Sequence, residues 1–493
     1  MRLVSAFLFL LATTGGASAQ TARVLTLEEA LRLAGATSEN VAIAEAEVAR
    51  AEGGRLRARS LTRPQLAGSA SYERALASEF SSIFDASGPP CPALDIDASR
   101  PLAERVAEIE RALDCGAVGG FSFGGGDDDG GGLPFGQKNT WRANLAFTQG
   151  IYSGGRVGAA RAVAAAAYAA AAVGVDTAKA QLALDVTRAY YDAALADRLV
   201  TIAEASHAQA SALYDQSRQL FEAGSRPEFE LLRAEVARDN QLPVVIRARS
   251  QRDIAYLRLR QLLDLPAGIA LQLEAGLADP ALPPPAVFVE ALGRVDTAAP
   301  GAAMSDAALR AGIRQAEAVV TLNEATVSLA RAQKMPTVSA VSNFGQVAYP
   351  GGIFPSDWRT NWTVGAQMTL PILDGGRLNS EIAVAAADLA AARARLQQTR
   401  ELSALDAETA RQELVAAEAA WKAGAGTVTQ ARRAYEIAEL RYREGISTQL
   451  ELADSRLALE SAEANRAQAA RDVQVARARI ALLPNLPLSG GSF

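Results

Sequence analysis

The feature of this sequence that most constrains its fold is an internal duplication at a fixed spacing. Gly154 and Gly375 each lie in a Gly-Gly-Arg turn between an alternating run and an alanine-rich stretch, and their numbers differ by 375 − 154 = 221. The same offset separates two further pairs, Trp141 with Trp362 and Gly224 with Gly445. One gapless offset therefore relates a strand, a long helix and a turn, and we expect the two copies to fold alike.

The N-terminus has the three parts of a secretory signal peptide. Arg2 supplies the positive charge, residues 3–12 form the apolar core, and Ala17-Ser18-Ala19 is a small-residue cleavage site, which gives a signal peptide of residues 1–19. The apolar run is too short for a membrane anchor, and no later segment predicts a transmembrane helix. The net charge of −6, without a basic block, disfavours a nucleic-acid partner.

A second offset marks an insert in the first copy. Pro64 matches Pro336 at an offset of 336 − 64 = 272, so the first copy is longer than the second by 272 − 221 = 51. The insert, at about 77–138, includes a glycine-rich run with three aspartates, which is typical of a solvated loop rather than of a metal site. It also contains Cys91 and Cys115, the two cysteines of the chain. In an exported protein a disulfide between them is a candidate, with two free thiols as the alternative.

Four β-strands are expected, two in each copy, at about 65–76, 139–151, 337–349 and 361–373. Runs of about ten alternating residues have the length that a tilted strand needs to cross a bilayer. Trp141 and Trp362 are assigned to the membrane interface, where tryptophans gather. Pro371 should end regular pairing of the last strand. Four strands cannot close a barrel alone, so they either pair with other copies of the chain or form a soluble sheet.

Long helices follow each pair of strands. No proline interrupts residues 155–222 or 377–444, and such stretches predict helices of roughly 100 Å that pack in a coiled-coil-like bundle. Each helix ends at a tight turn with a glycine suited to a helix C-cap. The turns lie at about 223–227 and 444–448, around Gly224 and Gly445. Return helices follow, with two candidate capping boxes, Ser225/Glu228 and Thr448/Glu451, and an expected kink at Pro243.

Each copy of the repeat has the same order of elements: a helix, two strands, a long helix, a tight turn and a return helix. In this order the chain resembles the TolC family of outer-membrane efflux proteins. The resemblance covers essentially the whole mature chain and rests on LTLEEALRLA, the paired GGR turns and the REG-type turn after Tyr442. It implies a mainly α fold with a small β part. The domains are then a signal peptide (1–19), a first repeat (20–268), a linker (269–300), a second repeat (301–484) and a tail (485–493).

The resemblance also implies an assembly and its partners. Three chains of a homotrimer would each contribute four strands to a closed twelve-stranded barrel in outer-membrane lipid. The helical hairpins would form a periplasmic α-barrel, and the insert would be an extracellular loop. The hairpin turns would meet a periplasmic adaptor protein that connects the duct to an inner-membrane transporter.

Members of the TolC family close their tunnel with a network of hydrogen bonds and ion pairs, and line its entrance with acidic rings. By resemblance, Tyr442 belongs to the closing network, Glu451 and Asp454 are ring positions, and Glu230 is an acidic position of the first copy. Ser447 stands where the archetype has an arginine, so the closing network lacks one partner. The residues themselves leave alternatives open: Glu451 as a helix cap, Asp454 as a solvated charge and Tyr442 as a packed aromatic.

The two turns are candidate docking sites for the adaptor, although ordinary turn chemistry explains the same residues. The set is Gly224, Ser225, Arg226, Gly445, Ile446 and Ser447. An enzyme is not expected, because His207 is the single histidine and lies within a predicted helix. Neither a histidine metal site nor a Ser-His-Asp triad is therefore available, and no cofactor is expected.

The leading functional hypothesis is a passive exit duct in the outer membrane with a long periplasmic extension. Its cargo is either small toxic compounds, as in multidrug efflux, or polypeptides, as in type I secretion. The alternative is a trimeric, coiled-coil-rich structural or adhesin protein of the cell envelope. An adhesin does not need a helical hairpin repeated at a fixed spacing, which favours the duct.

Overall fold

The computed structural model describes residues 23–77, 92–115, 139–266, 268–269, 271–274, 277, 310–350, 353–355 and 357–488. The chain divides into a helical unit (Met1–Leu56, Ala160–Ser328 and Ser380–Phe493) and a second unit that contains the main sheet (Arg57–Ala159 and Leu329–Asn379). The predicted mainly α fold with a small β part is confirmed.

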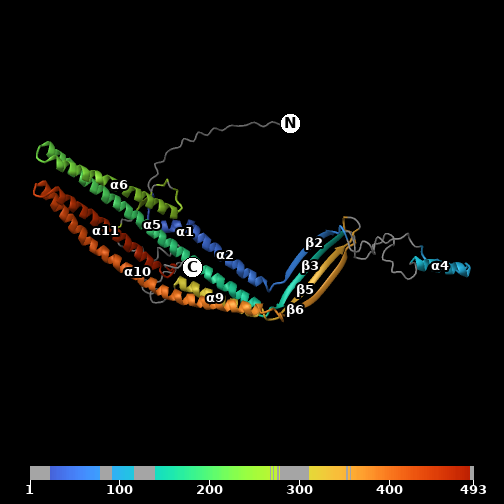
Figure 1. The fold of residues 1–493 in the computed structure, drawn as a ribbon. Helices are drawn as coiled ribbons and strands as arrows, with labels where there is room; N and C mark the ends of the chain where they lie inside the picture. Colours follow the sequence, from blue (N-terminus) through green and yellow to red (C-terminus); the bar gives the residue numbers. More distant parts are fainter. Residues whose placement is uncertain are drawn as a thin grey trace, which may run out of the picture. The chain divides into compact units, whose positions relative to one another are not determined.

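The helical unit is built from two long hairpins and shorter elements around them. The first hairpin consists of α5 (Arg156–Glu222) and α6 (Glu228–Leu262), and the second of α10 (Arg377–Arg443) and α11 (Gln449–Leu482). Figure 1 shows the four helices side by side in the order α6, α5, α11, α10. The other elements are α1 (Leu27–Thr37), α2 (Glu39–Ser60), α9 (Ala311–Ala332), and strands β1 (Arg23–Leu25) and β4 (Leu271–Leu273), which pair in parallel.

The structure reproduces both sequence offsets at the level of element bounds. The bounds of α10 are those of α5 shifted by the first offset, 377 − 156 = 221, and both helices have 67 residues. The bounds of α9 are those of α2 shifted by the second offset, 311 − 39 = 272, and both have 22 residues. Because helices as long as α5 and α10 extend over roughly 100 Å, they cannot fold back into a globular core and must be stabilised by neighbouring helices along their length.

The apolar core of the helical unit lies where the short elements pack on the hairpins. Its largest fully buried side chains include Leu25, Leu31, Tyr190, Leu259 and Leu482, from five different elements. Tyr190 donates its hydroxyl to the backbone carbonyl of Leu25 at 3.1 Å, which satisfies a polar group that burial would otherwise penalise. The N-terminal strand is therefore held against the middle of α5.

The two hairpins contact each other through α5 and α11. Ser206 Oγ donates to Glu460 Oε2 at 2.7 Å, and Arg471 pairs with Asp192 at 2.7 Å. A guanidinium nitrogen of Arg456 also donates to the carbonyl of Ser206 at 3.4 Å. We call this contact between α5 and α11 the intrachain seam.

The second unit contains a four-stranded antiparallel sheet with the order β2-β3-β5-β6. The strands are β2 (Gln65–Arg74), β3 (Asn139–Tyr152), β5 (Thr337–Ala348) and β6 (Arg359–Thr369). In the described part of the chain, β2 and β6 each pair with a single strand and are exposed along their whole length. The sheet therefore has two open edges, which are templates for pairing with another chain.

One face of the sheet is apolar across all four strands, because the register places the apolar sets opposite each other. β2 contributes Leu66 opposite Phe147 of β3, which also contributes Leu145 opposite Phe344 of β5. Phe344 in turn lies opposite Trp362 of β6. Many of these side chains remain exposed, as do Val364 and Met368 further along β6. An exposed apolar face of this size marks a surface that meets lipid or a partner.

The Gly-Gly-Arg turns after β3 and β6 adopt the same backbone in both copies. Gly154 and Gly155 have φ values of +59° and +88°, and Gly375 and Gly376 have +63° and +88°. Only glycine occupies these conformations without strain, which explains the repeated motif. Asp374 then accepts hydrogen bonds from the backbone nitrogens of Gly376 and Leu378, and these bonds lower the pKa of its carboxyl.

The two predicted capping boxes have different outcomes. Thr448 caps α11 and accepts a hydrogen bond from the backbone nitrogen of Glu451 at 3.3 Å, as predicted. The Ser225/Glu228 box is wrong, because α6 begins at Glu228 behind Pro227, which makes no side-chain cap. Pro227 stands at the N-cap with an extended backbone, and its carbonyl accepts a hydrogen bond from the backbone nitrogen of Glu230 at 3.1 Å. Pro243 lies inside α6, and the helix continues through it.

One helix of the described chain, α5, is long and apolar enough to cross a membrane. α5 contains an 18-residue window with a mean hydropathy of 1.4, which would suit a span by length and composition. Only 6% of this window is buried within one chain, and alanine supplies much of the apolar character of the stretch. α5 is the one helix among the described residues that is long and apolar enough, and a single such helix is weak evidence for a transmembrane span.

Candidate functional site

The tips of the two hairpins have matching backbone geometry. Gly224 donates to the carbonyl of Phe221 at 2.8 Å, and Ser225 donates to that of Leu220 at 2.9 Å. In the second hairpin Gly445 and Ile446 make the equivalent bonds, at 3.0 and 2.8 Å, to the repeat equivalents of those two residues. Both are Schellman motifs, in which a glycine with positive φ closes the helix and satisfies its last carbonyls.

Arg226 connects the two tips. Its guanidinium lies 5.7 Å from the ring centroid of Tyr442 and 3.2 Å from Glu230, which lies one turn away in α6. Gln449 of the second hairpin donates its side-chain amide to the backbone carbonyl of Glu230 at 3.2 Å. Tyr442 is buried with Leu452 in a small apolar cluster. A cation over an aromatic face stabilises such a contact, so the tips of one chain are held together.

The arginine beside Tyr442 comes from the first copy of the repeat. The offset of 221 carries Arg226 onto Ser447, since 447 − 226 = 221. The first copy thus has an arginine at the equivalent position, and the fold brings it to Tyr442 of the second copy. Sequence reasoning assigned Arg226 to adaptor docking and did not connect it with Tyr442, although the repeat offset contained that signal. Ser447 itself is buried, and its hydroxyl donates to the carbonyl of Thr448.

The three acidic candidates have different surroundings. Glu230 is held by Arg226, and Glu451 pairs with Arg441 at 3.0 Å in addition to lying in the α11 cap. Asp454 is exposed on α11, one turn after Glu451. The structure therefore places Glu451 and Asp454 on neighbouring turns of one helix, while Glu230 belongs to the contact between the tips.

Most of the predicted docking residues are exposed at the turns. Gly224, Ser225 and Gly445 are exposed, and Ile446 is 70% exposed, which is unusual for an isoleucine. Three buried polar atoms near them have no hydrogen-bond partner among the described residues: Glu230 Oε2, Tyr442 Oη and Gln449 Oε1. Buried polar atoms are normally paired, so these three atoms are exceptions within the contact between the tips.

The two tryptophans are not at the same register level of the sheet. Trp141 lies opposite Ala348 of β5, and its indole nitrogen donates to the carbonyl of Ile353 at 2.8 Å. Trp362 lies opposite Phe344, further along the same strand, and is 69% exposed. In a sheet with tilted strands, residues at different register levels can share one height above the membrane. Their assignment to the membrane interface remains a prediction.

Within the insert the structure describes α4 (Leu102–Asp114) and the cysteine that follows it. Cys115 is disulfide-bonded, and Arg111 donates towards its sulfur at 3.5 Å. Cys91 lies outside the described residues, so the predicted Cys91–Cys115 pairing remains a prediction.

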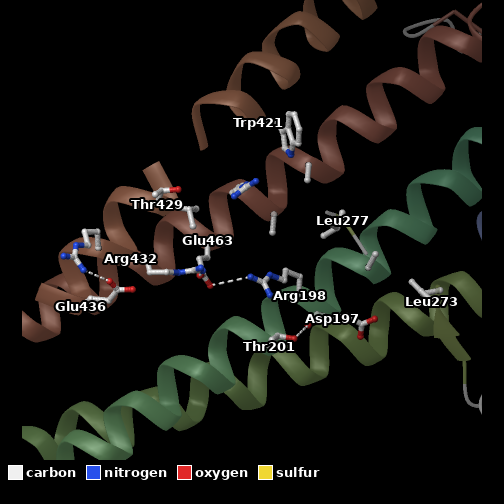
Figure 2. Close-up of a pocket in the computed structure, with 16 residues that line it drawn as sticks. Asp197, Arg198, Thr201, Leu273, Leu277, Trp421, Thr429, Arg432, Glu436 and Glu463 are labelled. Atoms are coloured by element: carbon white, nitrogen blue, oxygen red, sulfur yellow. Dashed lines mark hydrogen bonds and ion pairs between the residues drawn. The ribbon is translucent and has the colours of Figure 1, made fainter. Parts of the chain in front are cut away.

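A pocket of about 780 Å³ lies along the intrachain seam, between α5, α10 and α11. Figure 2 shows Arg198 and Arg432 directed towards Glu463, with ion-pair distances of 3.7 and 2.5 Å, and Trp421 at the far end of the pocket. Asp197 accepts a hydrogen bond from Tyr256, and burial together with this bond raises the pKa of the tyrosine hydroxyl.

Ion pairs hold several of the charged side chains of this pocket. Arg198 and Arg432 pair with Glu463 across helices, and Arg433 pairs with Glu436 within α10. Among the described residues no group of acidic, histidine or cysteine side chains is arranged to hold a metal ion. The arrangement can join helices through charge pairs.

Long helical hairpins, together with a small sheet that has an apolar face and two open edges, define a subunit of the outer-membrane channel class. Comparison with known proteins agrees with this class. The chain belongs to the outer membrane efflux protein family, whose model matches residues 119–264 and 306–485. The predicted recognition and the outer-membrane localisation with a periplasmic extension are confirmed. The family and the fold are those of channels rather than of an enzyme family.

Individual relatives are distant. The chain is 27% identical to nodulation protein T of Rhizobium leguminosarum bv. viciae over 330 residues, which is 64% of this chain and 62% of that protein. The outer membrane channel CmeC of Campylobacter jejuni has a TM-score of 0.69 at 15% identity, covering 94% of this chain and 87% of the other. The open state of MtrE from Neisseria gonorrhoeae has a TM-score of 0.67 at 18% identity, covering 94% and 89%. At such identities the structures show the shared fold.

Proposed function

We propose that the chain is one subunit of a trimeric exit duct that crosses the outer membrane and extends through the periplasm. The observation that carries this proposal is the four-stranded sheet with an apolar face and two open edges, in a chain of the outer membrane efflux protein family. Barrels in membranes need about eight strands or more, so one chain cannot close a barrel, whereas three chains supply enough strands. Closure also removes the open edges, which are unfavourable in lipid.

The hairpin tips would lie at the periplasmic end of such a duct, where protein partners can bind. The exposed turns, including Ile446, would meet a periplasmic adaptor, and an inner-membrane transporter would supply the energy. The competing structural or adhesin function loses support, because the family is one of channels.

The acidic pair on α11 is proposed to set the ion preference of the duct. With threefold symmetry, Glu451 and Asp454 would place six carboxylates around one axis, and such rings attract cations. The double variant Glu451→Gln/Asp454→Asn should lower the cation-over-anion permeability ratio at least about twofold, measured from reversal potentials in salt gradients. Glu401→Gln, an exposed change on α10 far from the turns, is the control and should leave the ratio unchanged. An unaltered ratio in the double variant would remove the ring assignment.

Cargo is tested in the cell. A deletion strain is compared with its parent for sensitivity to unrelated toxic compounds and for protein released into the medium. Hypersensitivity with normal secretion identifies an efflux duct, and loss of one large secreted protein with normal sensitivity identifies a secretion duct. A strain unchanged in both respects, while the chain is expressed in the parent, would contradict the exit-duct proposal.

A further inference from the structure

Helix α4 of the insert has an apolar face that the described part of the chain leaves uncovered. Its four large apolar residues recur at spacings of four, three and four and are 69, 44, 36 and 55% exposed: Leu102, Val106, Ile109 and Leu113. At about 100° per residue they lie within a sector of roughly 60° on one side of the helix. Such spacings are those of the a and d positions of a coiled-coil heptad, so α4 has the face of a coiled-coil helix.

The chain of the insert packs on a different side of α4. Arg111 donates to the backbone carbonyl of Pro92 at 3.2 Å, and Ala112 is fully buried. Arg105 and Glu108 are half-buried on the same side as Ala112. Neighbouring residues of the insert therefore hold the helix, while its apolar face stays exposed.

Two charged residues flank the apolar face in the arrangement that joins parallel helices. With Val106 at a heptad a position, Arg105 falls at g and Glu110 at e. In a parallel coiled coil a g residue meets the e residue five positions later on the neighbouring helix, and 110 − 105 = 5. In an antiparallel pair g meets g and e meets e, which would bring like charges together. The charges therefore favour parallel contact with a second copy of α4.

The two charged groups are not used by the ion pair that described residues form within α4. That pair joins Glu108 with Arg111 at 2.5 Å. Arg105 Nε has no hydrogen-bond partner among the described residues, and Glu110 is exposed. A carboxylate from a neighbouring helix would therefore supply a partner for the guanidinium of Arg105.

We propose that the α4 helices of three copies pack in parallel on the threefold axis beyond the barrel, with Arg105 of one copy paired with Glu110 of the next. The partner is a second copy of this chain, and the inference rests on the proposed trimeric duct. Rotation about a single axis keeps the three helices parallel, as the charges require. The contact joins the copies through the insert, separately from the strand edges and the helical hairpins.

The symmetry of the duct sets the number of helices in this contact. Ile109 at d with Leu113 at a is a combination that favours three or four helices, whereas Leu102 with Val106 suits two. A helix of 13 residues is too short to associate stably alone. Tethering to one trimer raises the effective concentration of the helices into the millimolar range, so even a weak contact forms.

The connections on either side of α4 are long enough to bring it to the axis. Arg74 of β2 pairs with Asn139 of β3, so the insert leaves the sheet at one end of these strands. The chain has 102 − 74 − 1 = 27 residues before α4 and 139 − 114 − 1 = 24 after it. A twelve-stranded barrel has a radius of roughly 12 Å, and an extended chain spans about 3.3 Å per residue. Either connection therefore reaches the axis.

A carbodiimide, which joins a lysine amine to a carboxylate in direct contact, tests the pairing in the full-length protein. Arg105→Lys places an amine at the proposed contact, and α4 has no lysine of its own. In denaturing gels this variant should give several-fold more covalent trimer than the wild type, because each amine meets Glu110 of the next copy. The reaction is run in detergent and in lipid vesicles.

The matched control removes the acceptor alone. Arg105→Lys/Glu110→Gln keeps the amine and the shape of the acceptor, and should return the covalent trimer to the wild-type level. Arg105→Lys/Val106→Asp places a charge in the apolar face and should have the same effect. Arg105→Lys/Ala107→Asp places that charge at an exposed position about 100° further around the helix, and should keep the covalent trimer.

The native mass of each variant is measured in parallel. A trimeric particle in which Arg105→Lys gives no more covalent trimer than the wild type would overturn the α4 contact alone, as would be found if α4 lay on the lipid surface instead. Equal amounts of covalent trimer with and without the Glu110 carboxylate would overturn the Arg105–Glu110 pairing. A monomeric particle in every variant would overturn both this contact and the trimeric duct.

Discussion

Asp406→Asn is expected to lower the free energy of unfolding by about 3–5 kcal/mol, which is the usual cost of leaving a buried charge without its partner. The carboxylate of Asp406 accepts from Arg310 at 2.5 Å and from Arg479 at 2.8 Å. Arg310 is only 2% exposed, and its other strong bond is to the carbonyl of Ser403 at 2.6 Å. The substitution leaves the Arg310 guanidinium buried beside a neutral amide. Urea denaturation in detergent, followed by tryptophan fluorescence, measures the loss.

Glu413→Gln is the matched control for this prediction. Glu413 also pairs with Arg479, at 2.5 Å, but its side chain is 49% exposed. Exposed ion pairs contribute about 0–1 kcal/mol, so the control should be nearly neutral. If both variants lost the same free energy of unfolding, burial of Arg310 would not be the cause of the destabilisation.

Gly154→Ala is expected to destabilise the protein far more than Gly375→Ala, although the two glycines are repeat equivalents. Both have a left-handed backbone, which costs an alanine about 1–2 kcal/mol. A Cβ on Gly154 would overlap Cβ of Met335 and lie 3.1 Å from the carbonyl oxygen of Pro336. Overpacking of this kind adds about 1–3 kcal/mol.

Gly375→Ala isolates the backbone term. A Cβ on Gly375 meets no atom within 4 Å, so this variant should lose only the conformational part of the free energy. Thermal unfolding of the two variants, monitored by the yield of folded protein after heating, gives the comparison. Indistinguishable midpoints would mean that the crowding at Met335 relaxes without cost.

Sequence reasoning succeeded where a property repeats or is local. The offset of 221 anticipated that α5 and α10 would match, and the positive φ of Gly224 and Gly445 follows from the chemistry of glycine at helix ends. Alternation of apolar residues located the strands, because a sheet with one apolar face requires it. These signals need only neighbouring residues or a self-comparison.

Contacts between distant segments were not predicted. Nothing in the local sequence pairs Arg310 with Asp406, and the equivalent of Arg310 in the first copy is Ser38, since 310 − 272 = 38. Arg226 was assigned to the surface of the turn because its packing on Tyr442 depends on how the two hairpins lie together. Ser225 is a cap candidate by residue type alone, whereas α6 begins directly after Pro227, two positions later.

The measurement that tests the central claim most directly is the conductance of the purified protein in planar lipid bilayers. The wild-type chain is compared with Arg226→Gln, which weakens the contact between the hairpin tips at Tyr442 and Glu230. An exit duct predicts discrete conductance steps, with larger or longer openings in the variant. Inserted trimers that remain silent in both forms, over a range of voltages and salt concentrations, would contradict the proposal that this chain forms a duct.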